Sequence, residues 1–263
     1  MQDYGYRKHA RSPGLEVVPR DEHLRRFGKD YSPGQHVTKL GPTGRGKTTL
    51  SGEMLGKVIS PDFQVVVLHG KIQGRDSAIP RMAERYNLRI VHTWPPPPSL
   101  KYRKKKINGY ILMPLQHAGE STIEENALLQ AEFRRAIHSN YAETKVPTIT
   151  HVDESHQAQE TLKLKTDLEG PLMRGAPHNA EWNNVQRGRF VSYHCYDAPE
   201  HIIIFYDPDE SNQKRYAEIG GVDKNAIIDH TSNLRTERAA SGQTISQALY
   251  IRRSGPEMYI IDT

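Results

Sequence analysis

The chain has 263 residues, enough for one large domain with a substantial core. It carries 36 Lys and Arg against 31 Asp and Glu, which gives a net charge of +5, and its mean hydropathy is −0.72. The sequence has no apolar run of about 18 residues, so no membrane span is expected, and the single Cys195 excludes an intrachain disulfide framework. We therefore expect a soluble cytoplasmic protein whose basic balance is compatible with a polyanionic partner.

The N-terminal residues 1–35 differ in composition from the rest of the chain. They are rich in Arg, Lys, Gly, Pro and Asp, with only short apolar stretches. We interpret them as an N-terminal arm that lies over the core or over a neighbouring subunit. In residues 36–263 strand and helix signals alternate, which predicts one α/β domain with a mainly parallel central sheet flanked by helices.

A phosphate-binding motif follows the first expected strand, residues 36–40. Residues 41–48 match the Walker A pattern G-x-x-x-x-G-K-[ST], and a helix is expected from Lys47. Backbone N–H groups and the helix N-terminus of such a loop bind phosphate oxygens. We expect Lys47 to reach the β- and γ-phosphates of ATP and the Thr48 hydroxyl to bind Mg²⁺. The predicted nucleotide-binding residues are Gly41, Pro42, Thr43, Gly44, Arg45, Gly46, Lys47, Thr48 and Thr49.

Further along the chain, apolar runs and capping signals predict more strands and helices. The expected strands are residues 63–68, 88–92 and 107–113, and the expected helices are residues 77–86 and 121–140. Between them, Pro95 to Pro98 exclude a helix or a central strand. We expect residues 94–106 to form an exposed basic loop, which either is simply solvated or contacts phosphates through Lys101, Arg103, Lys104, Lys105 and Lys106.

A second motif lies at residues 146–154, where an expected strand ends in Asp153 and Glu154. This is the pattern of a Walker B element. We expect Asp153 to hold Mg²⁺ and Glu154 to orient and deprotonate the attacking water. A carboxylate pair of this kind is typical of additional-strand ATPases, and it disfavours a small-molecule kinase, which needs an acceptor site and an arginine-rich lid.

With these motifs the chain resembles the FtsK/HerA branch of P-loop ATPases, particularly the compact DNA-packaging and translocating ATPases of tailed bacterial viruses. The resemblance covers about residues 36–263. The resemblance rests on residues 41–49, 151–156, 172–175, 186–189, 198–210 and 214–221. It implies an additional-strand, RecA/FtsK-like fold and an ATP-hydrolysing motor that forms a pentameric or hexameric ring on double-stranded DNA. It also implies a viral protein of the host cytoplasm, with a portal or another docking protein as a partner, and DNA contacts by the basic loop.

The resemblance also implies that a basic residue of one subunit completes the ATP site of its neighbour. Arg187, Arg189 and Arg174 are the candidates, and the alternative is that these arginines only solvate a helix end or pair with acids. After its Gly-Arg, the family has a hydrophobic strand that ends in a polar sensor, often Gln. Residues 190–199 are shorter and contain no Gln, so either His194 or Asp197 is the sensor or the stretch is abridged.

Another class of function stays open at this stage. A non-translocating P-loop ATPase could use the same motifs as an assembly or regulatory switch on a protein partner. At the C-terminus, residues 248–253 and 258–261 predict a closing β-hairpin.

Overall fold

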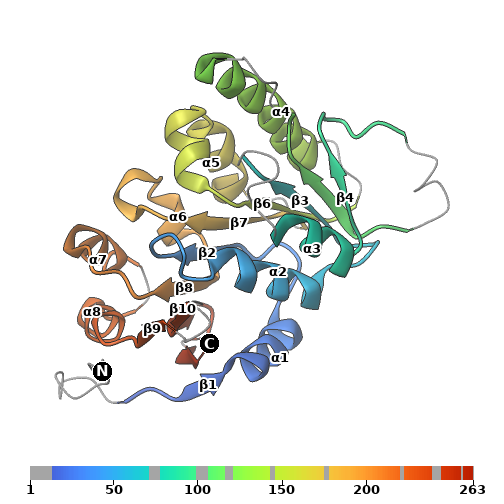
Figure 1. Cartoon of the computed structure of the whole chain (residues 1–263). Helices are drawn as coiled ribbons and strands as arrows, with labels where there is room; N and C mark the ends of the chain where they lie inside the picture. The colour runs from blue at the N-terminus through green and yellow to red at the C-terminus, as the bar shows by residue number, and fades with distance from the viewer. Residues whose placement is uncertain are drawn as a thin grey trace.

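A central sheet with helices on both faces forms the protein (Figure 1). The computed structural model describes residues 14–70, 78–98, 106–115, 121–142, 146–174, 178–219, 222–238, 244–255 and 257–262. The strands of the large sheet are β1 (Val17–Pro19), β2 (Val37–Leu40), β3 (Gln64–Leu68), β4 (Leu88–Val91), β5 (Gly109–Leu112), β6 (Thr148–Val152), β7 (Ala180–Val185), β8 (His201–Phe205), β11 (Ala248–Arg252) and β12 (Glu257–Asp262). A separate hairpin consists of β9 (Thr236–Arg238) and β10 (Thr244–Ser246).

The helices confirm the expected alternation of strands and helices. They are α1 (Arg20–Asp30), α2 (Lys47–Val58), α3 (Ala78–Arg85), α4 (Thr122–Ala142), α5 (Lys165–Arg174), α6 (His194–Asp197), α7 (Glu210–Tyr216) and α8 (Lys224–Ser232). A π-helical turn spans Gln157–Thr161 and a 3-10 turn spans Gly188–Phe190. None of the helices in the described ranges is both long enough and apolar enough to cross a membrane.

The strand order is β1-β12-β11-β8-β2-β7-β6-β3-β5-β4. All neighbours from β8 to β4 pair in parallel, whereas β11 is antiparallel to β8 and to β12. The C-terminal hairpin expected from the sequence is therefore present, and it extends the parallel sheet on one side. This arrangement confirms the mainly parallel α/β fold.

One strand of the core, β7, was not predicted from the sequence. It lies between β2, which leads into the Walker A loop, and β6, which ends at the Walker B carboxylates. This position defines the additional-strand arrangement. The sequence of β7 is Ala-Glu-Trp-Asn-Asn-Val, and all of its residues are buried. Strand patterns built on apolar alternation miss it because Glu181, Asn183 and Asn184 bind other polar groups inside the core.

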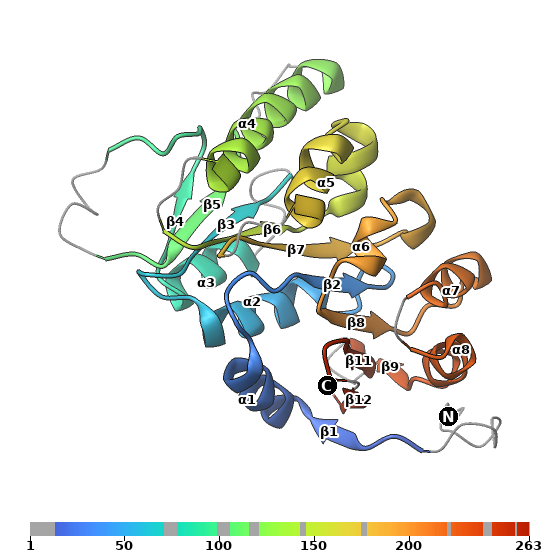
Figure 2. The same cartoon turned by 180° about the vertical axis from the view of Figure 1, so that it is seen from behind.

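Helices cover the two faces of the sheet, so its central strands are buried on both sides (Figures 1 and 2). In β8, Ile203 and Phe205 join the core cluster beneath α1 and α2, while Ile202 and Ile204 join the cluster beneath α7 and α8. A strand buried on both faces has a continuous apolar run in its sequence, as Ile202 to Phe205 do.

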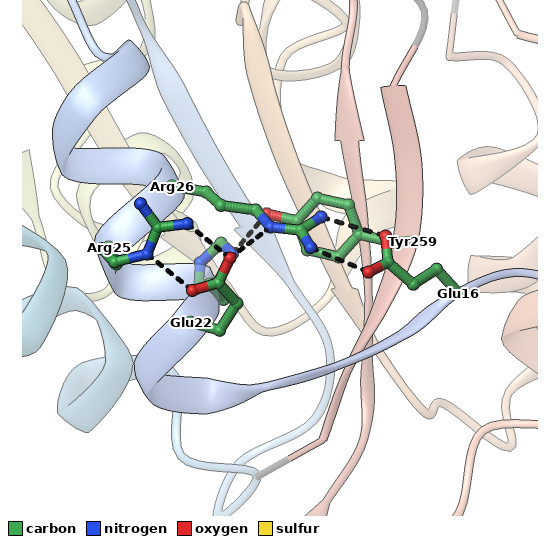
Figure 3. Close-up of polar contacts among 6 residues, drawn as sticks. Glu16, Glu22, Arg25, Arg26 and Tyr259 are labelled. Atoms are coloured by element: carbon green, nitrogen blue, oxygen red, sulfur yellow. Dashed lines mark hydrogen bonds and ion pairs between the residues drawn. The ribbon is translucent and has the colours of Figure 1, made fainter.

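The N-terminal segment is packed against this domain. β1 extends the sheet by pairing with β12, and Phe27 of α1 is buried in the core cluster. Within the segment, the Arg26 guanidinium donates to both carboxylate oxygens of Glu16, at 2.8 and 3.0 Å. The same guanidinium lies 5.5 Å from the ring centroid of Tyr259 in β12 (Figure 3). The described part of the expected arm thus lies over the core of its own chain.

Candidate nucleotide-binding site

The candidate site lies where the carboxyl ends of β2, β7, β6 and β3 meet. Their parallel register puts the residues that follow these strands along one edge of the sheet. Ligands of open α/β sheets bind at this edge. The Walker A loop, the Walker B carboxylates and the end of β7 are therefore brought together.

The Walker A loop has a backbone that requires its glycines. Gly44 and Gly46 have φ values of +79° and +88°, which L side chains rarely adopt. At Gly41, with φ +142°, a Cβ atom would lie 2.8 Å from Cβ of Phe205. The loop ends at Gly46, and α2 starts at Lys47, so the N-terminus of a helix faces the loop.

Two basic residues of the loop have different surroundings. Lys47 is buried, and its Nζ donates to the carbonyl oxygens of Gly41 and Pro42 at 2.5 and 2.7 Å. Arg45 instead turns to the C-terminal part of the chain, where it donates to Thr236 Oγ1 at 2.5 Å and lies 5.6 Å from the Tyr206 ring centroid. Lys47 is therefore placed at the loop, whereas Arg45 ties the loop to β9.

The two predicted magnesium ligands are in direct contact. Thr48 Oγ1 donates to Asp153 Oδ1 at 2.8 Å, and Asp153 is buried. Asn184 Nδ2 lies 3.0 Å from the same carboxylate oxygen, and His69 Nδ1 lies 3.0 Å from Oδ2. A hydroxyl and a carboxylate are the oxygen ligands that Mg²⁺ takes in P-loop sites, so these residues fit the ion.

His69 and Asn184 are site residues that were not predicted from the sequence. His69 directly follows the predicted strand of residues 63–68, next to the Walker B strand in the sheet, and this position was the available signal. Asn184 gave no signal, because its strand was not predicted. Its Oδ1 also accepts a hydrogen bond from Ser51 Oγ of α2 at 2.9 Å, so it links the Walker A helix to Asp153.

A glutamine occupies the end of the additional strand. Gln186 follows β7, its Nε2 donates to Glu154 Oε1 at 3.2 Å, and its Oε1 accepts from Thr43 Oγ1 at 3.1 Å. It therefore contacts both motifs. The sequence suggested His194 or Asp197 as the sensor, or an abridged stretch at residues 190–199. In the structure these residues comprise the last residue of a 3-10 turn and α6, and His194 Nδ1 pairs with Asp197 Oδ1 at 3.3 Å.

Two of the three candidate arginines, Arg187 and Arg189, come just after Gln186 in the chain. Arg187 and Arg189 are exposed and flank the buried Gly188. The Arg189 guanidinium lies 4.5 Å from the Phe190 ring centroid, and Phe190 is itself exposed. Arg174 is the last residue of α5. The structure thus places Arg187 and Arg189 at the surface next to the site.

The expected basic loop is described only at its two ends. Trp94 is buried, with Nε1 2.5 Å from Ser139 Oγ and its ring 5.7 Å from that of Tyr110. The expectation that exposure begins at residue 94 is therefore wrong, because this indole packs against α4 and β5. Lys106 is exposed. The other predicted DNA contacts lie outside the described residues: Lys101, Arg103, Lys104 and Lys105.

Comparisons with known proteins agree with this geometry. No family model matches the sequence, and no curated protein is similar to it in sequence. Among solved structures, B204, the DNA-packaging ATPase from Sulfolobus turreted icosahedral virus, is 12% identical with a TM-score of 0.56, over 88% of this chain and 98% of that one.

The chain has the P-loop NTPase fold. The genome packaging NTPase B204 from Sulfolobus turreted icosahedral virus 2, in complex with ATP-gammaS, is 14% identical with a TM-score of 0.54, over 88% of this chain and 98% of that one. The pCW3 conjugation coupling protein TcpA, in its monomer form with ATPgS, is 11% identical with a TM-score of 0.50, over 88% of this chain and 60% of that one. At these identities the likeness is one of fold, and it agrees with the resemblance to FtsK/HerA-type ATPases.

Proposed function

We propose that this protein hydrolyses ATP and uses the energy to translocate double-stranded DNA as a subunit of a ring. One observation carries the ATPase part: the Walker B carboxylates lie beside the Walker A loop, although the two motifs are far apart in the chain. Asp153 accepts from Thr48, and Glu154 is linked to Thr43 through Gln186. The DNA part is supported by the fold shared with a DNA-packaging ATPase and a conjugation coupling protein.

The binding role belongs to the Walker A loop. Its backbone N–H groups and the N-terminus of α2 bind the phosphates, and Lys47 supplies the counter-charge. Thr48 and Asp153 hold Mg²⁺, which when bound neutralises charge on the β- and γ-phosphates. Asn184 and His69 fix the Asp153 carboxylate in the orientation that also contacts Thr48.

The chemical step belongs to Glu154 and Gln186. Glu154 accepts a proton from the attacking water as the water oxygen bonds to the γ-phosphorus and the bond from that phosphorus to the β–γ bridging oxygen breaks, so that ADP leaves. Gln186 orients Glu154 through their 3.2 Å hydrogen bond and is the proposed sensor of the γ-phosphate, because it also contacts Thr43 of the phosphate-binding loop. This assigns the sensor role to the end of β7, the strand between the two Walker motifs.

Ring assembly is proposed for the exposed arginines. Arg187 or Arg189 of one subunit would complete the ATP site of its neighbour, as positive charge supplied in trans stabilises phosphoryl transfer. The basic segment, residues 101–106, would contact the DNA backbone. A viral portal or another docking protein remains the proposed partner of the ring.

A single comparison tests this function. ATP hydrolysis is measured with and without duplex DNA, alongside the mass of the particle in solution, with Lys47→Ala as the control that removes phosphate binding. We expect DNA-stimulated hydrolysis by an oligomer and none by Lys47→Ala. A monomer that hydrolyses ATP at the same rate with and without DNA would favour the regulatory switch instead.

A further inference from the structure

Two segments of the chain lie side by side from the catalytic carboxylate to the protein surface. We name them the Walker B segment, residues 153–162, and the arginine segment, residues 186–197. Their first contact is the Glu154–Gln186 hydrogen bond. The second is between the rings of His156 and Phe190, whose centroids are 5.4 Å apart. The third contact joins Gln159 to Ser192, and both of these residues are buried.

Gln159 belongs to a π-helical turn. Leu162 N donates to Gln157 O at 2.9 Å, the i to i+5 bond of a π-helix. Such wide turns are rare, and they often occur at functional sites. This one directly follows the Walker B carboxylates, and its Gln159 side chain is buried, with a relative exposure of 2%.

Both polar atoms of the Gln159 side-chain amide contact the arginine segment. Oε1 accepts a hydrogen bond from Ser192 N at 2.7 Å, and Nε2 lies 3.4 Å from Cys195 Sγ. Ser192 Oγ also donates to Glu169 Oε1 of α5 at 2.5 Å. A buried amide that lost these partners would be left unsatisfied, so the contact fixes the position of Ser192.

The arginine segment has little room to move independently between these contacts. A Cβ atom at Gly188 would lie 2.4 Å from the Tyr196 hydroxyl oxygen and 3.0 Å from Tyr216 Cε1. Arg187 and Arg189 flank this closely packed glycine and are exposed. Any displacement of the segment would therefore change the position of both arginines at the surface.

We propose that Gln159 is a positioning residue that couples the nucleotide state at Glu154 and Gln186 to the exposed pair Arg187 and Arg189. The inference rests on the proposed function, since it takes the γ-phosphate as the group that Glu154 and Gln186 sense. Bound ATP fixes the positions of Glu154 and Gln186. Gln159, in the turn that follows Glu154, then fixes the position of Ser192 through its hydrogen bond. The arginine pair then presents one arrangement with ATP and another without it.

Amide hydrogen exchange of the whole protein tests the coupling. With Mg²⁺ and ATPγS, we expect the amides of residues 188–192 to exchange more slowly than in the nucleotide-free protein. In Gln159→Met the Ser192 amide loses its acceptor, and we expect about fivefold to tenfold faster exchange, the factor for one hydrogen bond. The variant should no longer slow its exchange when ATPγS binds, and its affinity for a fluorescent ATP analogue should stay unchanged.

The control is Glu160→Gln, in the same turn, whose side chain makes no hydrogen bond with the described residues. It should respond to ATPγS as the unaltered protein does. If Gln159→Met is too unstable to purify, Gln159→Asn keeps the amide but withdraws it from Ser192 by one methylene and should give the same result.

The outcomes separate the inference from the proposed function. A protein that does not bind ATPγS contradicts the proposed function. A protein that binds it without any change at residues 188–192, or a Gln159 variant that keeps the full response, overturns the coupling. A merely structural role would lower the melting temperature of the variant and leave its response to ATPγS intact.

Discussion

Gln186 at the end of β7 donates a 3.2 Å hydrogen bond to Glu154, which follows the neighbouring strand β6. The same side chain accepts from Thr43 of the Walker A loop at 3.1 Å. One amide therefore bridges the phosphate-binding loop and the proposed general base. Substitutions at Gln186 or Glu154 should therefore change ATP hydrolysis without changing ATP binding.

Glu154→Gln should bind ATP and fail to turn it over. The substitution keeps the size and polarity of the side chain but removes the base, and the loss of a general base lowers the rate by about 10²- to 10⁴-fold. Steady-state hydrolysis and the affinity for a fluorescent ATP analogue measure the two properties separately. Hydrolysis at the unaltered rate would show that the Walker B assignment is wrong.

Gln186→Ala should lower turnover while leaving ATP affinity nearly unchanged. Removing one donor that stabilises developing charge costs about 10²- to 10³-fold in kcat. His194→Gln is the matched comparison, because the sequence suggested His194 as the sensor and the structure pairs it with Asp197 in α6. We expect His194→Gln to retain full turnover. The reverse ranking of these two variants would restore His194 as the sensor.

Mixing two inactive proteins should restore hydrolysis if an arginine acts across a subunit boundary. Arg187→Ala or Arg189→Ala lacks the arginine but keeps Glu154, and Glu154→Gln keeps both arginines. An arginine supplied in trans is worth about 10³- to 10⁵-fold in rate in related sites. Hydrolysis is followed as the ratio of the two proteins is varied. Mixtures no more active than their separate components would exclude shared sites at these arginines.

The basic segment should set the salt dependence of DNA binding. Replacing Lys101, Arg103, Lys104, Lys105 and Lys106 with Ser should flatten the plot of log affinity against log salt by about 0.9 per lost phosphate contact. Basal ATP binding should persist. Replacement of the exposed Lys163 and Lys165 is the control for a general loss of charge. An unchanged slope in the first variant would assign the segment to a solvated surface loop.

Acid should destabilise the fold well before its carboxylates protonate. Burial lowers the pKa of His23 and His201 to about 3 and that of His36 and His151 to about 4. An unfolded histidine has a pKa of about 6.5, so below that pH the unfolded chain binds more protons than the folded one. The free energy of unfolding should therefore fall as the pH drops from about 6.5 to about 4, by about 1.4 kcal/mol per pH unit for each histidine.

One buried acid opposes this trend. Burial raises the pKa of Glu181 to about 8, so it is protonated in the folded protein and releases its proton on unfolding above its ordinary value of 4.5. It therefore offsets the effect of about one histidine in that range. Urea unfolding at pH 7 and pH 5.5 measures the net change. Equal unfolding free energies at the two values would contradict the neutral burial of these histidines.

The sequence by itself determined the Walker motifs and the alternation of strands and helices. Gly44 and Gly46 carry that information locally, because their positive φ values and the adjacent helix start depend on a few neighbouring residues. The apolar run of β8 likewise reports burial on both faces. Such signals depend on residues close together in the chain, so the phosphate-binding residues could be named before the fold was known.

Only the tertiary structure decided how the motifs meet. β7 contains Glu181, Asn183 and Asn184, whose side chains bond to polar groups inside the core, so apolar periodicity does not mark it as a strand. Its pairing between β2 and β6 joins residues far apart in sequence, and no local pattern encodes such a register. The position of the proposed sensor Gln186 and the contacts of Asn184 and His69 with Asp153 depend on that pairing. The carboxyl ends of parallel strands come together only when the whole sheet is assembled.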